Sequence, residues 1–250
     1  MASWDADALV ELRAAAFRRD GAAGFAVLRN RPLAPVLQFA GDLLADALRE
    51  ARTHPGQNPL GAQREDVEAL ARKCVEALEG RDAVGDALLA ETLREALDDP
   101  SGGPARHPRD AVQAVPVDLG ALAYALAEGD AVTILDLCTG DLLAEDELDD
   151  LHSDDIHSDD IHSDDIHSDG DRRLKALYRD TASAHDDMHV FAESEPDTPA
   201  PMRDVHAYTE ALAGTRLEFA WSLFREERQR GRARQWLADN GLEAAPRRLL

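Results

Sequence analysis

The sequence predicts a predominantly helical α+β protein, in which a helical N-terminal domain precedes a C-terminal domain with one small β-hairpin sheet. Alanine and leucine supply most of the apolar residues, and this composition favours helix over sheet. Apolar residues recur at helical spacing through the first hundred positions. Further along, two short apolar runs flank Thr139-Gly140, which is the pattern of a hairpin.

Four helices are expected in the N-terminal domain, residues 1–99. The first covers residues 5–19 and is closed by Asp20-Gly21; the second covers residues 35–52. A third ends at Glu79-Gly80 and a fourth covers residues 81–97. The apolar faces of the second and third helices are Val36, Ala40, Leu43, Leu44, Ala47 and Leu48, and Val67, Leu70, Ala71, Cys74, Val75 and Leu78.

A linker is expected over residues 100–114, because the run DDPSGGPARH at residues 98–107 contains several proline and glycine residues. The C-terminal domain, residues 115–245, is expected to begin with a short helix, LGALAYALAEG, with Asp118 as its N-cap. The segment AVTILDLCTGDLLA then forms the hairpin. We expect a short helix over Arg172–Tyr178 and a loop over residues 193–202.

Two helices are expected near the C-terminal end. The first places Leu217, Ala220, Trp221 and Phe224 in register. The second, EERQRGRARQWLADNG, ends in an Asn240-Gly241 stop signal. Its packing residues are Ala233, Trp236 and Leu237.

The composition points to an acidic cytoplasmic protein. Fifty Asp and Glu residues against 27 Lys and Arg give a net charge of −23, which disfavours generic phosphate binding by the whole chain. The sequence contains no run of about 18 apolar residues, so no membrane span is predicted. The start, MASWDADALVEL, carries acids where an export signal carries Lys or Arg, and Cys74 and Cys138 do not form a disulfide framework. Arginine greatly outnumbers lysine (Lys73 and Lys175), as in proteins of GC-rich bacteria.

An acidic repeat interrupts the C-terminal domain at residues 145–171. Units of His-Ser-Asp-Asp-Ile follow one another, and residues 141–171 hold fourteen acids without a Lys or Arg. The favoured interpretation is a slipped coding repeat in a disordered loop, because its few isoleucines bury little area and its charges repel. The alternative is a weakly bound divalent metal, for which imidazole and carboxylate are suitable ligands. Its ligands would be His152, Asp155, His157, Asp160, His162, Asp165 and His167.

Arginines cluster on the last expected helix, beside Trp236. The favoured interpretation is a solvated helix face with internal Glu–Arg pairs. Weak nucleic-acid, phosphate or partner contact is an alternative, as is docking of this helix on the protein's own acidic loop. The contact residues would be Arg228, Arg230, Arg232, Arg234 and Trp236.

Catalytic residues are not indicated by any motif: the sequence lacks a Gly-rich phosphate loop, GxSxG, HExxH and CxxC. No cofactor is therefore expected beyond the possible metal at the repeat. His185 and His189 have the i, i+4 spacing that holds a metal if the segment is helical. The alternative is that His189 begins a strand with Val190-Phe191.

Residues 115–245 resemble uncharacterised protein family 0158. The hairpin is similar to its LD-x-x-TG-E motif, with Leu135, Asp136, Thr139, Gly140 and Asp141 in place, and Met202-Arg-Asp-Val is similar to a second block. The final helix is similar to its F-x-[DE]-ER-x-x-x-RA-x-x-WL-x-x-x-G pattern. That match consists of Phe224, Glu227, Arg228, Arg232, Ala233, Trp236, Leu237 and Gly241.

The chain departs from the family at its G-x-GAFRRF block, of which Ala213-GTRLEF is a degenerate trace. The resemblance implies a fold and no biochemical activity. The leading hypothesis is a non-enzymatic interaction or scaffold protein of the bacterial cytoplasm with an unknown protein partner, because no catalytic constellation is indicated and the acidic and basic segments are separate. Divalent-metal binding by the repeat and weak nucleic-acid binding by the arginine helix are the alternatives.

Overall fold

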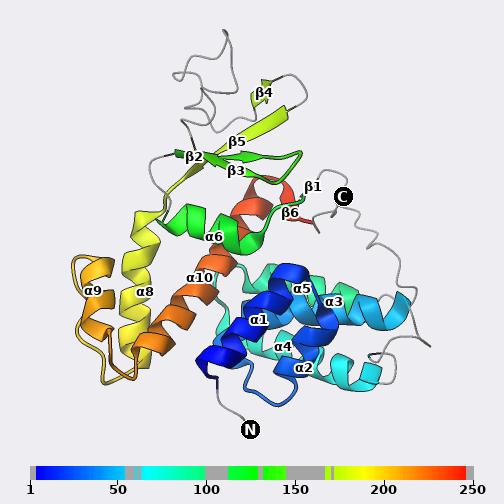
Figure 1. The fold of residues 1–250 in the computed structure, drawn as a ribbon, viewed down its shortest axis with the longest axis horizontal. Helices are drawn as coiled ribbons and strands as arrows, with labels where there is room; N and C mark the ends of the chain where they lie inside the picture. Colours follow the sequence, from blue (N-terminus) through cyan, green and yellow to red (C-terminus); the bar gives the residue numbers. More distant parts are fainter. Residues whose placement is uncertain are drawn as a thin grey trace. The chain divides into compact units, whose positions relative to one another are not determined.

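The computed structural model describes residues 4–53, 60, 63–98, 112–128, 132–144, 167–169 and 172–245. The chain divides into two compact units, Met1–Ala111 (unit 1) and Val112–Leu250 (unit 2). Unit 1 is helical in its described part, and unit 2 combines helices with short strands (Figure 1). The predicted class, a predominantly helical α+β protein, is confirmed.

Unit 1 is a bundle whose helices pack around α3. Its elements are α1 (Ala6–Arg18), α2 (Gly21–Leu28), the 3-10 turn η1 (Ala34–Val36), α3 (Leu37–Thr53), α4 (Arg64–Arg81) and α5 (Asp86–Asp98). Helix α3 contacts α1, α2, α4 and α5. The apolar faces predicted for the second and third helices are largely buried, and Cys74 lies fully inside. The four predicted helices are confirmed, but the fourth begins at Asp86 rather than at residue 81, which is the last residue of α4.

Helix α2 was not expected, because Asp20-Gly21 looked like the end of a helix rather than the start of another. Arg19 ends α1 in the left-handed conformation, at φ 52°. Asp20 then caps α2 by accepting a hydrogen bond from the Ala23 N–H at 2.9 Å. Gly21 is required by packing, since a Cβ there would overlap the backbone of Ala47 in α3.

Glu50 of α3 accepts a hydrogen bond from the Gly21 N–H at 2.8 Å, at the first turn of α2. Partial burial raises the pKa of the Glu50 carboxyl, and nearby Asp20 and Asp46 act in the same direction. Hydrogen bonds from the Gly21 and Ala22 N–H groups oppose this shift. The folded protein therefore holds the Glu50 proton more tightly than the unfolded chain does.

Replacing Glu50 by glutamine is expected to stabilise unit 1 increasingly as pH rises from about 4 towards 7. A raised folded pKa gives stability that is present at low pH and is lost as pH rises through that pKa. Glutamine keeps an acceptor oxygen for Gly21 and removes the charge. Urea unfolding of wild type and E50Q across this range measures the difference, with E76Q, on the exposed face of α4, as the control. A difference that does not vary with pH would contradict the assignment.

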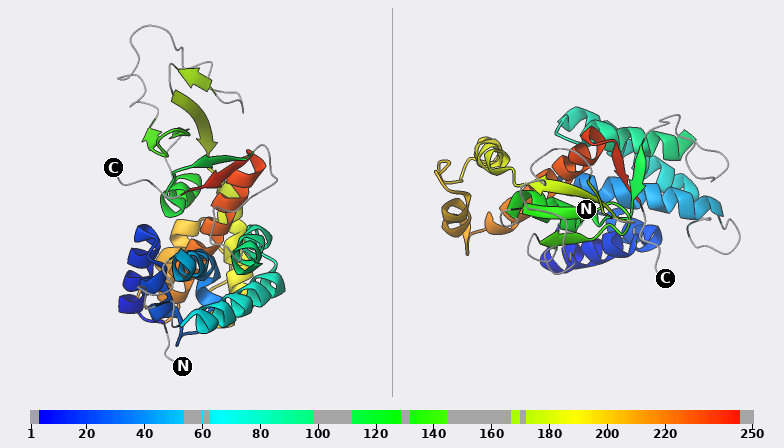
Figure 2. Two further views of the ribbon diagram at one scale, coloured as in Figure 1. Left: turned by 90° about the vertical axis from the view of Figure 1, so that its right-hand side faces the viewer. Right: turned by 90° about the horizontal axis from the view of Figure 1, so that it is seen from above.

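Unit 2 is organised along a long helix, α10 (Glu218–Asp239), which contacts α6, α8, α9 and β6 (Figures 1 and 2). Its helices are α6 (Leu119–Glu128), α8 (Thr181–Ser194), α9 (Val205–Leu212) and α10. Its strands are β1 (Gln113–Val115), β2 (Val132–Asp136), β3 (Leu142–Ala144), β4 (His167–Asp169), β5 (Arg172–Tyr178) and β6 (Leu242–Ala244). The strands form a four-stranded antiparallel sheet of order β3-β2-β5-β4 and a parallel pair, β1-β6.

The predicted hairpin and caps are confirmed. Strands β2 and β3 pair across a turn in which Asp136 accepts hydrogen bonds from the Cys138 and Thr139 N–H groups at 2.8 and 3.3 Å. Gly140 has φ 74° and lies against the Pro116 carbonyl, so no side chain fits there. Asp118 caps α6 by accepting from the Ala121 N–H at 2.7 Å, and α10 ends before Gly241.

Several local predictions are wrong. Arg172–Tyr178 is strand β5, not a helix, because its backbone pairs with β2 on one side and β4 on the other. Residues 167–169, expected within the disordered loop, form β4; the rest of the segment 145–171 lies outside the described residues. The two expected C-terminal helices are the single helix α10. His189 lies within α8 and does not begin a strand.

The two larger apolar clusters among the described residues of unit 2 stabilise its helices; a small third one joins Ile134 and Leu174 of the sheet. One surrounds α6 and the C-terminal end of α10, where the predicted packing residues Ala233 and Leu237 are buried. The other joins α8, α9 and the start of α10, and its buried members are Met188, Phe191, Tyr208, Leu212, Leu217 and Trp221. Among the described helices, none is both long and apolar enough to cross a lipid bilayer.

Candidate functional site

The arginine-rich part of α10 is largely packed against the protein itself. Arg230 is buried, and the side chains of Arg225, Arg228 and Arg232 are 17–22% exposed. Arg234 is half-buried. Trp236 is also half-buried and packs against the cluster around α6. The candidate contact residues are therefore mainly part of the interior of unit 2.

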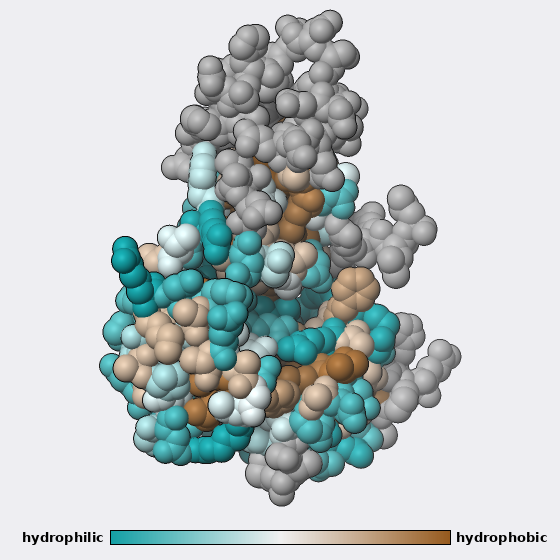
Figure 3. All heavy atoms as spheres, turned by 60° about the vertical axis from the view of Figure 1, so that its left-hand side comes forward, coloured by the Kyte–Doolittle hydropathy of each residue, from teal (hydrophilic) through white to brown (hydrophobic). Residues whose placement is uncertain are grey.

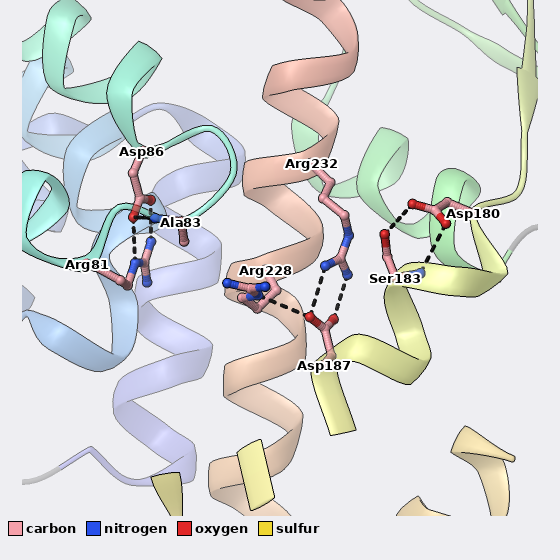
Figure 4. A network of polar contacts seen from close by, with 8 residues as sticks. All are labelled: Arg81, Ala83, Asp86, Asp180, Ser183, Asp187, Arg228 and Arg232. Atoms are coloured by element: carbon pink, nitrogen blue, oxygen red, sulfur yellow. Dashed lines mark hydrogen bonds and ion pairs between the residues drawn. The ribbon is translucent and has the colours of Figure 1, made fainter. Parts of the chain in front are cut away.

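Asp187 of α8 binds two of these arginines (Figure 4). Its carboxylate is 1% exposed and accepts from Arg228 Nε at 3.0 Å. Arg232 donates to both of its oxygens, at 3.0 and 2.7 Å. This bidentate arrangement is the strongest form of Arg–carboxylate pairing, and it joins α8 to α10. Sequence reasoning missed Asp187, because nothing distinguishes it from its exposed neighbour Asp186 except helical phase.

Arg225 makes a second pair, with Glu128 at the end of α6. Its guanidinium also lies 5.6 Å from the ring centre of Trp221, and that of Arg228 lies 5.9 Å from the Phe224 ring. These contacts place cations at the border of the aromatic cluster. The arginines of α10 thus connect three helices within unit 2.

Arg230 lies beside the first turn of α6. A Cβ at Gly120 would lie 3.1 Å from its NH1 atom, so the glycine leaves the space that the guanidinium occupies. Arg228 and Arg232 share Asp187 of α8 as their partner, whereas the acidic tract lies outside the described residues except for residues 167–169. Docking of α10 on that tract therefore stays a prediction.

The predicted repeat site also lies largely outside the described residues. This applies to His152, Asp155, His157, Asp160, His162 and Asp165. His167 is described by its backbone, as the first residue of β4, paired with Leu174. Metal binding by the repeat stays a prediction.

The His185–His189 pair lies on the exposed face of α8. The two Nε2 atoms are 3.4 Å apart, and the rings meet edge to face with centroids 5.0 Å apart. Within the described ranges, no cluster of three or more His, Cys, Asp or Glu side chains is arranged to hold a metal. Both histidines lie within helix α8, as is required for the i, i+4 pair to hold a metal.

Apolar side chains reach the surface at several places, and Figure 3 shows such brown atoms among hydrophilic ones on one face. The large exposed ones in the described residues are Val10, Phe17, Val84, Tyr124, Tyr178 and Val190. Val10 and Phe17 belong to the same helix, α1, and are 63% and 77% exposed. Sequence reasoning missed them, although apolar residues on both sides of one helix are a visible signal.

Unit 1 also has a surface pocket of about 320 Å³ between the end of α2 and the start of α4. Charges of both signs meet there, with Arg29 and Lys73 near Asp66. Its remaining lining residues are Phe25, Asn30, Gln63, Ala69 and Leu70. The lining has no histidine or cysteine and combines charged, polar and apolar side chains.

Comparison of the chain with protein-family models, with curated proteins and with solved structures finds no match. The resemblance of residues 115–245 to uncharacterised protein family 0158 therefore stays a prediction.

Proposed function

We propose that this chain is a non-enzymatic interaction protein of the bacterial cytoplasm that assembles with a second copy of itself through the outer face of α1. The observation that carries the proposal is that α1 is apolar on two sides. Ala8, Leu9, Leu12 and Ala15 face the core. A second stripe, which we call the outer stripe, faces away from it and consists of Ala6, Val10, Ala14 and Phe17.

The outer stripe has the spacing of a helix-pairing surface. Its members follow one another at intervals of four, four and three residues, so they align along the whole helix. The side chains of Val10 and Phe17 leave apolar surface in contact with water, and a partner helix would cover this surface. Ala14 provides room for a larger side chain of a facing helix.

The charges beside the stripe favour a second copy in the antiparallel direction. Asp7 lies in the first turn of α1 and Arg18 in the last. They are eleven residues apart, about three turns, and so lie on the same side of the stripe. A two-fold axis through the middle of α1 places Asp7 of each copy beside Arg18 of the other, and Val10 opposite Ala14. The surface is therefore complementary to itself, as an isologous interface requires.

We expect a weak, concentration-dependent dimer. Helix α1 has 13 residues, which corresponds to a length of about 20 Å. One helix pair of this length buries less than the roughly 1,200–2,000 Å² of a standard interface, which is the size range of weak and transient complexes.

Sedimentation equilibrium of the full chain over a range of concentrations tests the proposal. Wild type should dimerise, and Phe17→Asp should be monomeric throughout. Tyr124→Asp, which changes an aromatic residue on α6 that is 64% exposed, should behave as wild type. A wild type that stays monomeric at millimolar concentration, or a dimer that survives Phe17→Asp, would overturn the assignment.

Complementary charge reversal tests the direction of pairing. Asp7→Arg alone and Arg18→Asp alone each place like charges together in a homodimer, so each should associate more weakly than wild type. A mixture of the two variants restores two opposite-charge pairs and should form a heterodimer. Equal weakness of the mixture and of the separate variants would contradict the antiparallel arrangement. Because surface pairs contribute about 0.2–1 kcal/mol each, the recovery should be several-fold and should diminish in high salt.

Nucleic-acid binding by α10 is not the function that we propose, since Arg228 and Arg232 both bind Asp187.

A further inference from the structure

The exposed histidine pair of α8 is a candidate site that the proposed self-association does not involve. His185 and His189 are one turn apart, so the helix fixes their Cβ atoms within about 6 Å of each other. Both side chains are exposed, and their Nε2 atoms approach each other to within hydrogen-bond distance. The convergence of two ring nitrogens, rather than of ring carbons, is the arrangement that a shared cation requires.

The separation of the two nitrogens corresponds to a tetrahedral metal. With Zn–N bonds of 2.0–2.1 Å, two ligands at the tetrahedral angle are about 3.3–3.4 Å apart, whereas two ligands at 90° are about 2.9 Å apart. The Nε2 atoms of His185 and His189 are 3.4 Å apart. Without a metal, one ring can donate a hydrogen bond to the other at this distance, which is longer than the roughly 2.7–3.2 Å of N–H···O bonds.

The surroundings of the pair favour a cation. Asp186 follows His185 directly, and Glu193 lies one turn after His189; both are exposed on the same helix. Because side chains on a helix lean towards its N-terminus, Glu193 leans towards His189. These carboxylates place negative charge beside the two imidazoles and supply second-sphere acceptors for bound water.

We propose that His185 and His189 form a two-ligand surface site for a tetrahedral, borderline divalent cation of the zinc type. Each imidazole coordinates through Nε2 in its neutral form, and water completes the coordination. This site is separate from the acidic repeat, whose histidines lie elsewhere in the chain. Binding joins two successive turns of α8, so the cation stabilises that helix.

The test uses the full chain with the repeat histidines replaced, as H152Q/H157Q/H162Q/H167Q, so that the repeat does not compete for metal. Calorimetric titration with zinc should show one site. The helix holds the second imidazole at a high effective concentration, so removing either ligand by H185Q or H189Q should weaken zinc binding by about 100-fold. H206Q, which changes an exposed histidine on α9, is the matched control and should bind as its parent does.

A second measurement separates chelation from binding by single histidines. Cobalt bound at the pair should give the visible absorption of tetrahedral coordination, and this signal should disappear in both H185Q and H189Q. Circular dichroism of the apo-proteins verifies that the variants fold. Zinc affinity unchanged by either substitution, or an equal loss in H206Q, would overturn the proposal. So would a parent protein whose histidine-ring NMR signals do not respond to zinc.

Discussion

Replacing Asp86 by alanine is expected to lower the free energy of unfolding of unit 1 by about 3–5 kcal/mol, because it removes the acceptor of a buried network. Asp86 is 1% exposed and accepts from Arg81 Nε at 2.8 Å and from Arg81 NH2 at 2.6 Å. Gln38 of α3 and the Ala83 N–H donate to the same carboxylate, at 2.8 and 2.9 Å. This one side chain therefore joins α3, the end of α4 and the start of α5; Figure 4 shows its contacts with Arg81 and Ala83.

Urea unfolding measures this loss, and Glu68→Gln is a matched control. Glu68 also accepts from two arginines, Arg64 and Arg72, but these are 48% and 59% exposed. Exposed pairs contribute little, so the control should lose no more than about 1 kcal/mol. Similar losses in both variants would show that burial does not determine the contribution of the Asp86 network.

Replacing Asp187 by asparagine is expected to destabilise unit 2 by about 3 kcal/mol. The substitution keeps the shape of the side chain but leaves the guanidinium groups of Arg228 and Arg232 without their shared anion. Arg232→Gln should cost less, because Asp187 keeps its bond from Arg228. The order of stabilities, wild type above R232Q above D187N, is the expected result of chemical denaturation.

Asp186→Asn is the control for Asp187, since Asp186 is the adjacent acid on α8 and is exposed. Its effect should lie within about 0.5 kcal/mol. If D187N unfolds at the same urea concentration as D186N, the Asp187 pair is not a stabilising link between α8 and α10. Near-UV circular dichroism gives an independent readout, because Phe191 and Phe224 pack near Trp221 between the same helices.

The helices of unit 1 were predictable because their apolar residues recur along continuous segments. Gly21 shows where such reasoning fails: it looks like a terminator, and its reason for being glycine is contact with α3, far along the chain. The parallel pairing of β1 with β6 joins residues 113–115 to 242–244. The order of polar and apolar residues within a strand does not indicate which distant strand it pairs with. Strand β5 was missed for the same reason, since β2 and β4 supply its hydrogen bonds.

The sequence was sufficient to predict one candidate site but not the other. The spacing of His185 and His189 is local, so the sequence was sufficient to propose the pair. The partners of Arg228 and Arg232 depend on how α8 and α10 pack, and the sequence could not distinguish Asp187 from Asp186. From charge alone, the arginines of α10 were expected on a basic surface. Packing against α6 and α8 instead leaves most of these side chains largely buried.

The position of the repeat in the sheet has a consequence for how its length can vary. The chain between β3 and β4 contains the repeat, and these are the two outer strands of the sheet. Strand β4 is itself the His-Ser-Asp of the last unit, next to Arg172. Gain or loss of whole units upstream therefore presents the same three residues to β5 and leaves the β2–β5 register unchanged. A chain with more or fewer whole units is therefore expected to form the same sheet, which circular dichroism of variants that differ in unit number would measure.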